Sequence, residues 1–363
     1  MSYNLRFNCL KCSSLLFFLL ILQTGFAQRN KKNDKEYGLE KFPELDGALT
    51  QYQKLLGKDL VAIVSTDTIV FKKEMGDFNS KTEAPVASAS KWLTAALIMI
   101  LVDEGKLSLD DKVSYYLPIY ESYGKNYITL RHCLSHFTGI QADQGVLGMF
   151  QRKKFASLEQ EVESFAKKEI QTNPGTEFWY SNMGLNIAGR IAEIVMKRKF
   201  DQLIKQKLFN PLGMTKTTFS TLDASAINPS GGARSTASDY MRFLQMLLNK
   251  GKFNGKQIIS EASVKELRSI HTSNELIRYA PKTATGFQYA LGSWVLDENA
   301  TQGAEASILA SPGLLGTWPM IDWCRGYACI FFAKTLLGEQ KADAYQQLKG
   351  AIDERLKSNC SPL

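Results

Sequence analysis

Several features that would place this 363-residue chain in well-known protein classes are missing from it. No Gly-x-Ser-x-Gly segment occurs, which argues against an α/β-hydrolase with a nucleophile elbow. No basic stretch is interleaved with aromatic residues, so nucleic acid is not an expected partner. No segment after residue 27 is apolar over the length that spans a bilayer. Internal repeats and low-complexity linkers are also missing after Lys41, which favours one unit with an inserted lobe over two separate domains.

Residues 1–27 have the pattern of a signal peptide. Arg6 and Lys11 precede an apolar run at 15–22, and the small residues at 25–27 offer a cleavage site. The run is short for a membrane anchor, which is the alternative interpretation. We therefore expect export to a periplasm or to the outside of the cell, with no membrane span after cleavage. Removing the two cations lowers the formal net charge from +8 to +6.

Residues 28–41 mix basic and acidic side chains with few apolar ones, and they are predicted to be a charged, solvated linker. The chain from 42 to 357 has the composition of a globular domain. Apolar periodicity predicts two terminal helices, at 42–56 and 341–357. It also predicts five strands, at 60–64, 68–71, 287–296, 306–310 and 327–333.

The middle of the chain, to about residue 270, is mostly helical in pattern. Strands at both ends with helices between them predict an α+β fold. A sheet lobe is expected from approximately 42–85 and 286–357, with a helical lobe from approximately 86–285 inserted into it.

One apolar stretch stands out within that middle segment. Of the eleven residues after Lys91, ten are apolar and none is charged, so we predict a buried helix over 88–102 with Ser88 in its first turn. Residues three apart share a helix face, which places the Lys91 amine beside the Ser88 hydroxyl. Burial disfavours the charged form of a lysine, and a neutral amine can remove the serine proton. The same spacing occurs at Ser122/Lys125 and Ser164/Lys167, so the spacing alone is weak.

Two further segments hold candidate site residues. Tyr180-x-Asn182 lies between a turn signal and a helical pattern. Tyr180 is either a packing aromatic or a phenol that exchanges a proton with Lys91, and the Asn182 amide can donate to a substrate carbonyl. The segment Ser311-Pro312-Gly313-Leu314 is either a plain turn or a strand edge along which substrate lies. In the second case a backbone N–H from this edge joins that of Ser88 in an oxyanion hole.

The histidines and cysteines allow fewer conclusions. His132 and His136 are four apart, as in a pair of metal ligands on a helix, but no acidic third ligand lies at a suggestive spacing. We expect structural histidines, no metal and no cofactor. Export permits disulfides among the four cysteines that follow residue 27. Two of these, Cys324 and Cys329, flank an Arg-Gly pair typical of a hairpin turn and are placed to approach each other, whereas a free buried thiol is favoured for Cys133 and the pairing of Cys360 is left open.

Taken together, these residues resemble the serine β-lactamase and penicillin-binding-protein superfamily, and within it the class C-like branch of β-lactamases, esterases and D-amino-acid peptidases. Besides Ser88-x-x-Lys91 and Tyr180-x-Asn182, several family-like phrases follow in the expected order. They are the segments Leu101–Asp111, Ile128–Ile140, Pro211–Met214 and Gly231–Tyr240. The resemblance implies a β-lactamase/transpeptidase-like fold, with an antiparallel sheet flanked by the terminal helices and a site in the cleft beside the helical lobe.

The resemblance also implies roles for individual residues. Ser88 would be the acylated nucleophile, Lys91 its base, and Tyr180 the group that protonates the leaving group and later helps to activate water. Asn182 would orient the substrate. The backbone N–H groups of Ser88 and Leu314 would form the oxyanion hole.

One position departs from the family pattern. Where the family has Lys or His, this chain has Ser311, ahead of Gly313, and a hydroxyl has no charge with which to attract a substrate carboxylate. We therefore expect an exported serine hydrolase acting on a small ester, amide or peptide. One alternative is a β-lactamase or D-alanyl (DD-) peptidase. Another is a catalytically weak relative that binds peptidoglycan or a peptide in the same cleft, and the oligomeric state is left open.

Overall fold

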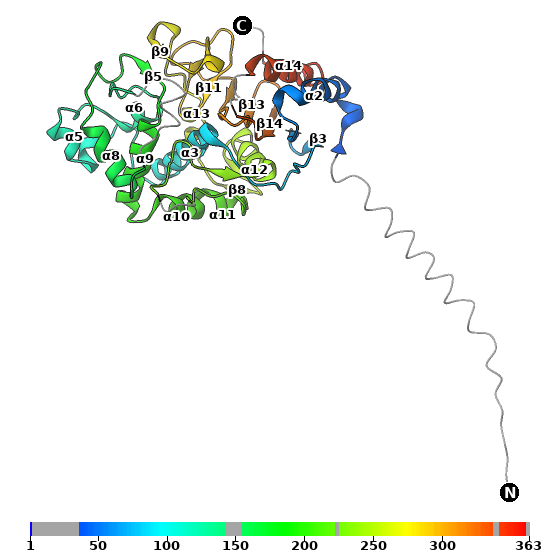
Figure 1. Cartoon of the computed structure of the whole chain (residues 1–363), viewed down its shortest axis with the longest axis horizontal. Coiled ribbons are helices and arrows are strands. Elements are labelled where there is room, and N and C mark those ends of the chain that lie inside the picture. Colours follow the sequence, from blue (N-terminus) through cyan, green and yellow to red (C-terminus); the bar gives the residue numbers. More distant parts are fainter. Residues whose placement is uncertain (2–35, 143–153, 222–224, 337–340, 361–363) are drawn as a thin grey trace.

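An eight-stranded antiparallel sheet combines strands from both ends of the chain (Figure 1). The computed structural model describes residues 1, 36–142, 154–221, 225–336 and 341–360. In spatial order the strands are β1 (Glu36–Tyr37), β3 (Ile69–Met75), β2 (Leu60–Ser65), β14 (Tyr327–Ala333), β13 (Trp318–Asp322), β12 (Ile308–Ala310), β11 (Trp294–Val295) and β10 (Gln288–Tyr289). Helices cover this sheet. The α+β fold expected from the sequence is therefore confirmed.

The centre of the sheet joins the N-terminal and C-terminal segments. β2 pairs with β14 over six residue pairs, from Leu60 opposite Ala333 to Ser65 opposite Ala328. Every residue of both strands is buried. Such strands are apolar on both faces, and this is why they read as continuous hydrophobic runs rather than as alternating patterns.

The two faces of the sheet are covered by different helices. Helices α2 (Pro43–Leu56) and α14 (Ala342–Asp353) pack against each other and over one face (Figure 1). Their buried residues belong to one hydrophobic cluster with Val64 and Phe331, whereas Ile63 and Ile330 belong to the cluster that includes the helical lobe. Successive strand residues point to opposite faces, so a single run of apolar residues supplies both cores.

The helical lobe surrounds one buried helix. Its helices are α3 (Ser90–Asp103), α4 (Val113–Tyr116), α5 (Ile119–Ser122), α6 (Leu130–Leu134), α8 (Leu158–Ala166), α9 (Met183–Met196), α10 (Phe200–Ile204), α11 (Asn210–Leu212), α12 (Ala237–Leu248) and α13 (Glu261–Leu267). Twelve of the fourteen residues of α3 are buried. Within the described ranges, no helix combines the length and the apolar character needed to cross a bilayer.

Short elements connect these parts. Three two-stranded pairs are β4 (Ala84–Pro85) with β6 (Arg234–Ser235), β5 (Phe178–Trp179) with β9 (Ile277–Tyr279), and β7 (Lys252–Phe253) with β8 (Lys256–Gln257). Tighter helical turns occur at η1 (Leu39–Lys41), η2 (Ala87–Ala89), η4 (Asn274–Leu276) and η5 (Lys282–Ala284), and a π-helical turn at η3 (Lys205–Phe209).

The strands differ from those predicted in three main respects. Part of the predicted linker, Glu36–Tyr37, forms the edge strand β1, because pairing with β3 uses the backbone and needs no apolar side chain. The strand β13 was not predicted; it contains Pro319, a residue that argues against a central strand. The predicted strand over 287–296 is divided into β10 and β11 by a turn in which Gly292 adopts a φ of 78°. The predicted signal peptide, residues 1–27, lies almost wholly outside the described residues.

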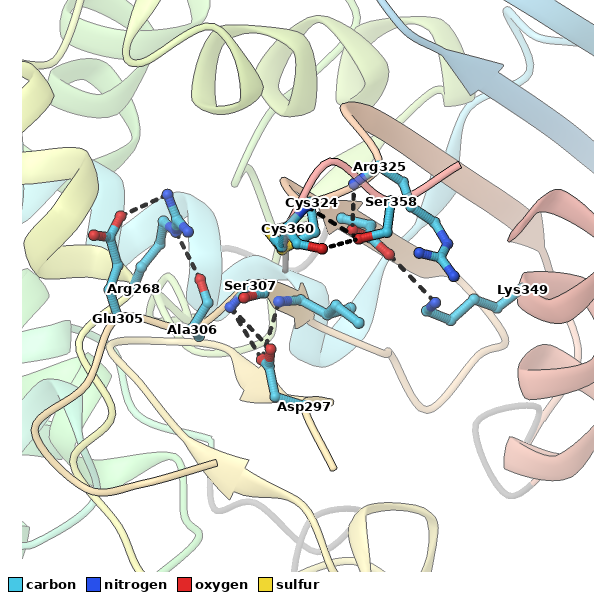
Figure 2. The surroundings of a disulfide bond; sticks show 12 residues. Arg268, Asp297, Glu305, Ala306, Ser307, Cys324, Arg325, Lys349, Ser358 and Cys360 are labelled. Atoms are coloured by element: carbon cyan, nitrogen blue, oxygen red, sulfur yellow. Dashed lines mark hydrogen bonds and ion pairs between the residues drawn. A yellow bond between two sulfur atoms is a disulfide. The ribbon is translucent and has the colours of Figure 1, made fainter. Parts of the chain in front are cut away.

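A disulfide joins Cys324, in the β13–β14 turn, to Cys360 near the C-terminus (Figure 2). The expected approach of Cys324 to Cys329 is therefore wrong. The β13–β14 ladder places Cys329 opposite Met320, inside the core under α2 and α14, while Cys324 lies beyond the end of that ladder. Cys133 and Cys329 are both free and buried.

Candidate active site

Ser88 lies in a strained turn at the entrance to α3. It belongs to the helical turn η2, and the regular helix begins two residues later, at Ser90, not at Ser88 as predicted. Ala87 has a φ of 46°, in the left-handed region that residues with a Cβ seldom adopt. The Ser90 hydroxyl donates to the Ala87 carbonyl oxygen at 2.6 Å and holds this turn. Strain of this kind is typical of functional sites.

Lys91 is almost fully buried, with 1% of the surface of the residue exposed. Its amine lies 3.4 Å from the Ser88 hydroxyl oxygen, 3.0 Å from Asn182 Oδ1 and 3.1 Å from the Ser230 carbonyl oxygen. The last two atoms can only accept hydrogen bonds, so they take two amine N–H groups. If the amine is neutral, these two bonds use both of its N–H groups, and its lone pair is then the group that can take the Ser88 proton. The structure thus brings together the serine and lysine that the sequence paired.

Tyr180 both packs and faces Lys91. The Lys91 amine lies 4.8 Å from the centroid of the Tyr180 ring, which is buried. The ring also packs against Trp294 and His136, with centroid separations of 5.1 and 4.7 Å. Tyr180 is thus a packing aromatic that also lies beside Lys91, and proton exchange between its phenol and Lys91 stays a prediction.

Ser230 was missed by sequence reasoning. Its backbone N–H donates to Asn186 Oδ1 at 2.9 Å, which turns its carbonyl oxygen toward Lys91. The Thr94 hydroxyl of α3 donates to the neighbouring Pro229 carbonyl oxygen at 2.6 Å. The available signal was the Gly-Gly pair after Ser230: a Cβ at Gly232 would lie 2.8 Å from a backbone oxygen of the same loop.

The segment after β12 lies against the turn that precedes Ser88. A Cβ on Gly313 would lie 2.1 Å from the Val86 carbonyl oxygen, so only glycine allows this approach of the two backbones. Leu314 follows directly and is 9% exposed. Ser311 is buried, and its hydroxyl donates to the Gly292 carbonyl oxygen at 3.3 Å.

Both histidines of the 132/136 pair are bound to protein groups. His132 Nδ1 accepts from the Thr129 backbone N–H and closes the capping box of α6. His136 lies under Tyr180, where burial and the nearby Lys91 hold the pKa of its imidazole well below the ordinary value. Among the described residues, no group of three or more His, Cys, Asp and Glu side chains is arranged to hold a metal ion.

Comparison with known proteins agrees with this architecture. A Bacteroides dorei protein assigned as a β-lactamase superimposes with a TM-score of 0.74 and 28% identity, over 85% of this chain and 98% of the other. EstCE1, a hydrolase with promiscuous acyltransferase activity, has a TM-score of 0.71 at 19% identity, over 86% of this chain and 98% of its own, which shows a shared fold.

Curated relatives match over shorter stretches. Protein Rv1367c of Mycobacterium tuberculosis is 27% identical over 286 residues, 64% of this chain and 71% of its own length. Protein flp of Staphylococcus aureus is 30% identical over 198 residues, 52% of this chain and 39% of its own length. The sequence profile of the Beta-lactamase family matches residues 46–351, most of the chain. The chain therefore belongs to the Beta-lactamase family of serine hydrolases.

Proposed function

We propose that this chain is an exported serine hydrolase that cleaves a small ester or neutral amide through an acyl-enzyme on Ser88. The observation that carries the proposal is the buried Lys91 amine, 3.4 Å from the Ser88 hydroxyl and bound to two acceptors on its other sides. A serine hydroxyl is a weak nucleophile until a neighbouring base takes its proton. Lys91 is the described group placed to do so.

Acylation proceeds by a balanced proton transfer. The Ser88 O–H bond breaks, its proton passes to Lys91, and the oxygen bonds to the substrate carbonyl carbon. The resulting oxyanion accepts hydrogen bonds from the backbone N–H groups of Ser88 and Leu314. When the bond to the leaving group breaks, Tyr180 protonates that group and recovers a proton from Lys91. Water then attacks the acyl carbon and loses a proton to the Tyr180/Lys91 pair. The bond between the acyl carbon and the Ser88 oxygen breaks, that pair returns the proton to Ser88, and the carboxylic acid leaves.

The preference for an uncharged substrate follows from Ser311. Its hydroxyl carries no charge and is engaged with the Gly292 carbonyl oxygen. A cation at this position would attract a carboxylate, as in the recognition of β-lactams or peptidoglycan peptides, and a hydroxyl does not replace it. Asn182, which accepts from Lys91 through Oδ1, has its amide N–H groups available to orient a substrate carbonyl.

Export is supported by two independent features. The first is the predicted signal peptide, and the second is the Cys324–Cys360 disulfide, a bond that forms and persists in oxidising compartments. Processing is tested by N-terminal sequencing of the secreted chain, which is expected to begin at Gln28.

Covalent labelling tests the catalytic assignment. A fluorophosphonate probe, followed by mass mapping, is expected to modify Ser88 and to leave Ser122 and Ser164, which share the Ser-x-x-Lys spacing, unmodified. Ser88→Ala should abolish turnover of p-nitrophenyl acetate, whereas Ser122→Ala should not change it. A folded protein that turns over esters with an unlabelled Ser88 would contradict the assignment.

Substrate comparison separates the alternatives. Rapid turnover of nitrocefin with negligible turnover of p-nitrophenyl acetate would indicate a β-lactamase or D-alanyl peptidase instead. If Ser88→Ala leaves the biological effect of the protein intact, the cleft serves binding rather than hydrolysis.

A further inference from the structure

His136 is a buried titratable residue that the proposed reaction does not use. It is 2% exposed and follows directly after the helix α6 and Ser135. It contacts the segment that carries Tyr180 at two points. Its backbone carbonyl oxygen accepts from the Trp179 N–H at 3.1 Å, and its Nδ1 atom accepts from the Ser181 N–H at 3.4 Å.

The two residues that donate to His136, Trp179 and Ser181, directly precede and follow Tyr180 in the sequence. The N–H of Tyr180 itself donates to the Tyr279 carbonyl oxygen at 3.1 Å, so three consecutive backbone donors are bound. Two of these three bonds end on His136. His136 therefore holds the backbone on both sides of Tyr180.

The backbone of His136 is strained in a way that permits both contacts. Its φ is 62°, in the left-handed region. This conformation lets the ring and the carbonyl oxygen of a single residue face the same neighbouring segment. Left-handed conformations at residues with a Cβ carry a cost, and they persist where surrounding contacts determine them.

The hydrogen bonds also determine the tautomer of the ring. Nδ1 accepts from Ser181, so it carries no proton, and the proton resides on Nε2. Nε2 lies 3.1 Å from the Tyr289 hydroxyl oxygen and donates to it. The titratable groups that face the ring among the described residues are Lys91, Tyr180 and Tyr289. A charged imidazole would carry a proton on Nδ1 and turn that N–H toward the Ser181 N–H, which would break this contact.

We infer that His136 is a positioning residue, which holds the Trp179–Ser181 backbone as a neutral imidazole so that the Tyr180 phenol meets the leaving group above Lys91. The inference rests on the proposed function, since it concerns the role of Tyr180 in acylation. It assigns no contact between His136 and substrate.

The test compares two esters of the same acid. An alkyl ester has a poor leaving group that needs a proton from Tyr180, whereas a p-nitrophenyl ester has an acidic leaving group that hardly needs one. The measured quantity is the ratio of kcat/KM for the alkyl ester to kcat/KM for the p-nitrophenyl ester. In His136→Leu this ratio should fall by about tenfold or more, because a small displacement of a catalytic group is costly. A purely structural loss lowers both rate constants equally and leaves the ratio unchanged.

Two milder variants keep the test decisive if His136→Leu does not fold. Asparagine tolerates the left-handed conformation and offers an acceptor near the Ser181 N–H, so His136→Asn should keep the ratio within about threefold of wild type. Tyr289→Phe removes the acceptor of Nε2–H and should lower the ratio by about fivefold, the size of one neutral hydrogen bond. His132→Leu is the matched control: it removes a similar contact at α6 and should lower stability without changing the ratio.

The outcomes distinguish this inference from the proposed function. If wild-type Ser88 is not labelled and neither ester is cleaved, the proposed function fails. If Ser88 is labelled and both esters are cleaved, but the ratio is the same in wild type and in the folded His136 and Tyr289 variants, only the positioning role is overturned. A ratio in His136→Asn as low as in His136→Leu would also overturn it.

Discussion

The hydroxyl of Ser311 donates a hydrogen bond to the carbonyl oxygen of Gly292, 3.3 Å away. This bond connects the end of β12 to the β10–β11 turn. The β10–β11 turn also lies against α3. A Cβ added to Gly292 would be only 2.8 Å from the Lys91 carbonyl oxygen. Ser311 is thus connected, through the single residue Gly292, to the backbone of the proposed base.

A cation at this position should change the substrate preference. We expect Ser311→Lys to raise kcat/KM for a carboxylate-bearing ester by about tenfold relative to a neutral ester, because a charge-assisted hydrogen bond contributes roughly 1.5–3 kcal/mol. Ser311→Met is the control, since it adds similar bulk to this buried position without charge. Equal preferences in the lysine and methionine variants would argue against this electrostatic role.

Removing the proposed base should slow acylation far more than removing another buried lysine. Lys91→Ala is expected to reduce the rate of Ser88 acylation by roughly 10²–10⁴-fold, the usual contribution of general acid–base catalysis. Lys125 is 3% exposed and follows Ser122 at the same spacing, so Lys125→Ala is a matched control that should leave the rate within a few-fold. Stopped-flow detection of p-nitrophenol release measures the acylation rate in each variant. A comparable loss of rate in the two variants would contradict the role of Lys91.

The disulfide should contribute to stability and not to the chemical step. Cys324 and Cys360 are 36 residues apart in sequence, and closing a loop of this length stabilises a protein by roughly 4 kcal/mol in the chain-entropy account. We expect Cys324→Ser, Cys360→Ser and the double variant to lower Tm equally, with unchanged kcat at a temperature where all are folded. A double variant clearly less stable than either single one would mean that the two sulfurs act separately.

Thiol counting tests the pairing directly. Cys133 and Cys329 are fully buried, and burial raises the pKa of both thiols, so neither should react with iodoacetamide in the folded protein. In protein expressed from residue 28 onward and unfolded without reductant, mass spectrometry should find two adducts, on these two residues. Adducts on Cys324 or Cys360 under those conditions would contradict the disulfide.

Stability should fall in mild acid through His271. Burial lowers the pKa of this histidine to about 4, with the charge of Arg131 acting in the same direction, and its buried Nε2 has no hydrogen-bond partner among the described residues. The unfolded chain binds a proton near pH 6.5 and the folded chain only near pH 4, so the stability present above pH 6.5 is lost progressively down to pH 4. The pKa difference between the folded and unfolded states corresponds to roughly 3 kcal/mol of unfolding free energy.

Urea unfolding at several pH values measures this loss. His271→Gln cannot titrate, so the difference in unfolding free energy between wild type and variant should be constant above pH 6.5 and should shift in favour of the variant as the pH falls to 4. Carboxylates titrate in both proteins and cancel in the comparison. A difference that does not vary between pH 7 and pH 4 would exclude His271 as the cause.

Several elements were predictable because their information is local. Ser88 and Lys91 are three residues apart, and the i, i+3 spacing that predicts neighbouring side chains holds across the tight turn that contains Ser88 and the start of α3. The strands β2 and β14 were recognisable as apolar runs bounded by turns. β13 was not recognised, because Pro319 argues against a strand until its neighbours are known.

The buried helix that follows Ser88, the sheet built from both ends of the chain and the family could all be inferred from periodicity or from motifs in order. Three findings required the folded chain: Ser230 and Asn182 accept from the Lys91 amine, His136 holds both sides of Tyr180, and Cys324 pairs with Cys360. The difference lies in distance along the chain. These contacts join segments separated by tens of residues or more, and their meeting depends on how the sheet and the helical lobe pack as a whole.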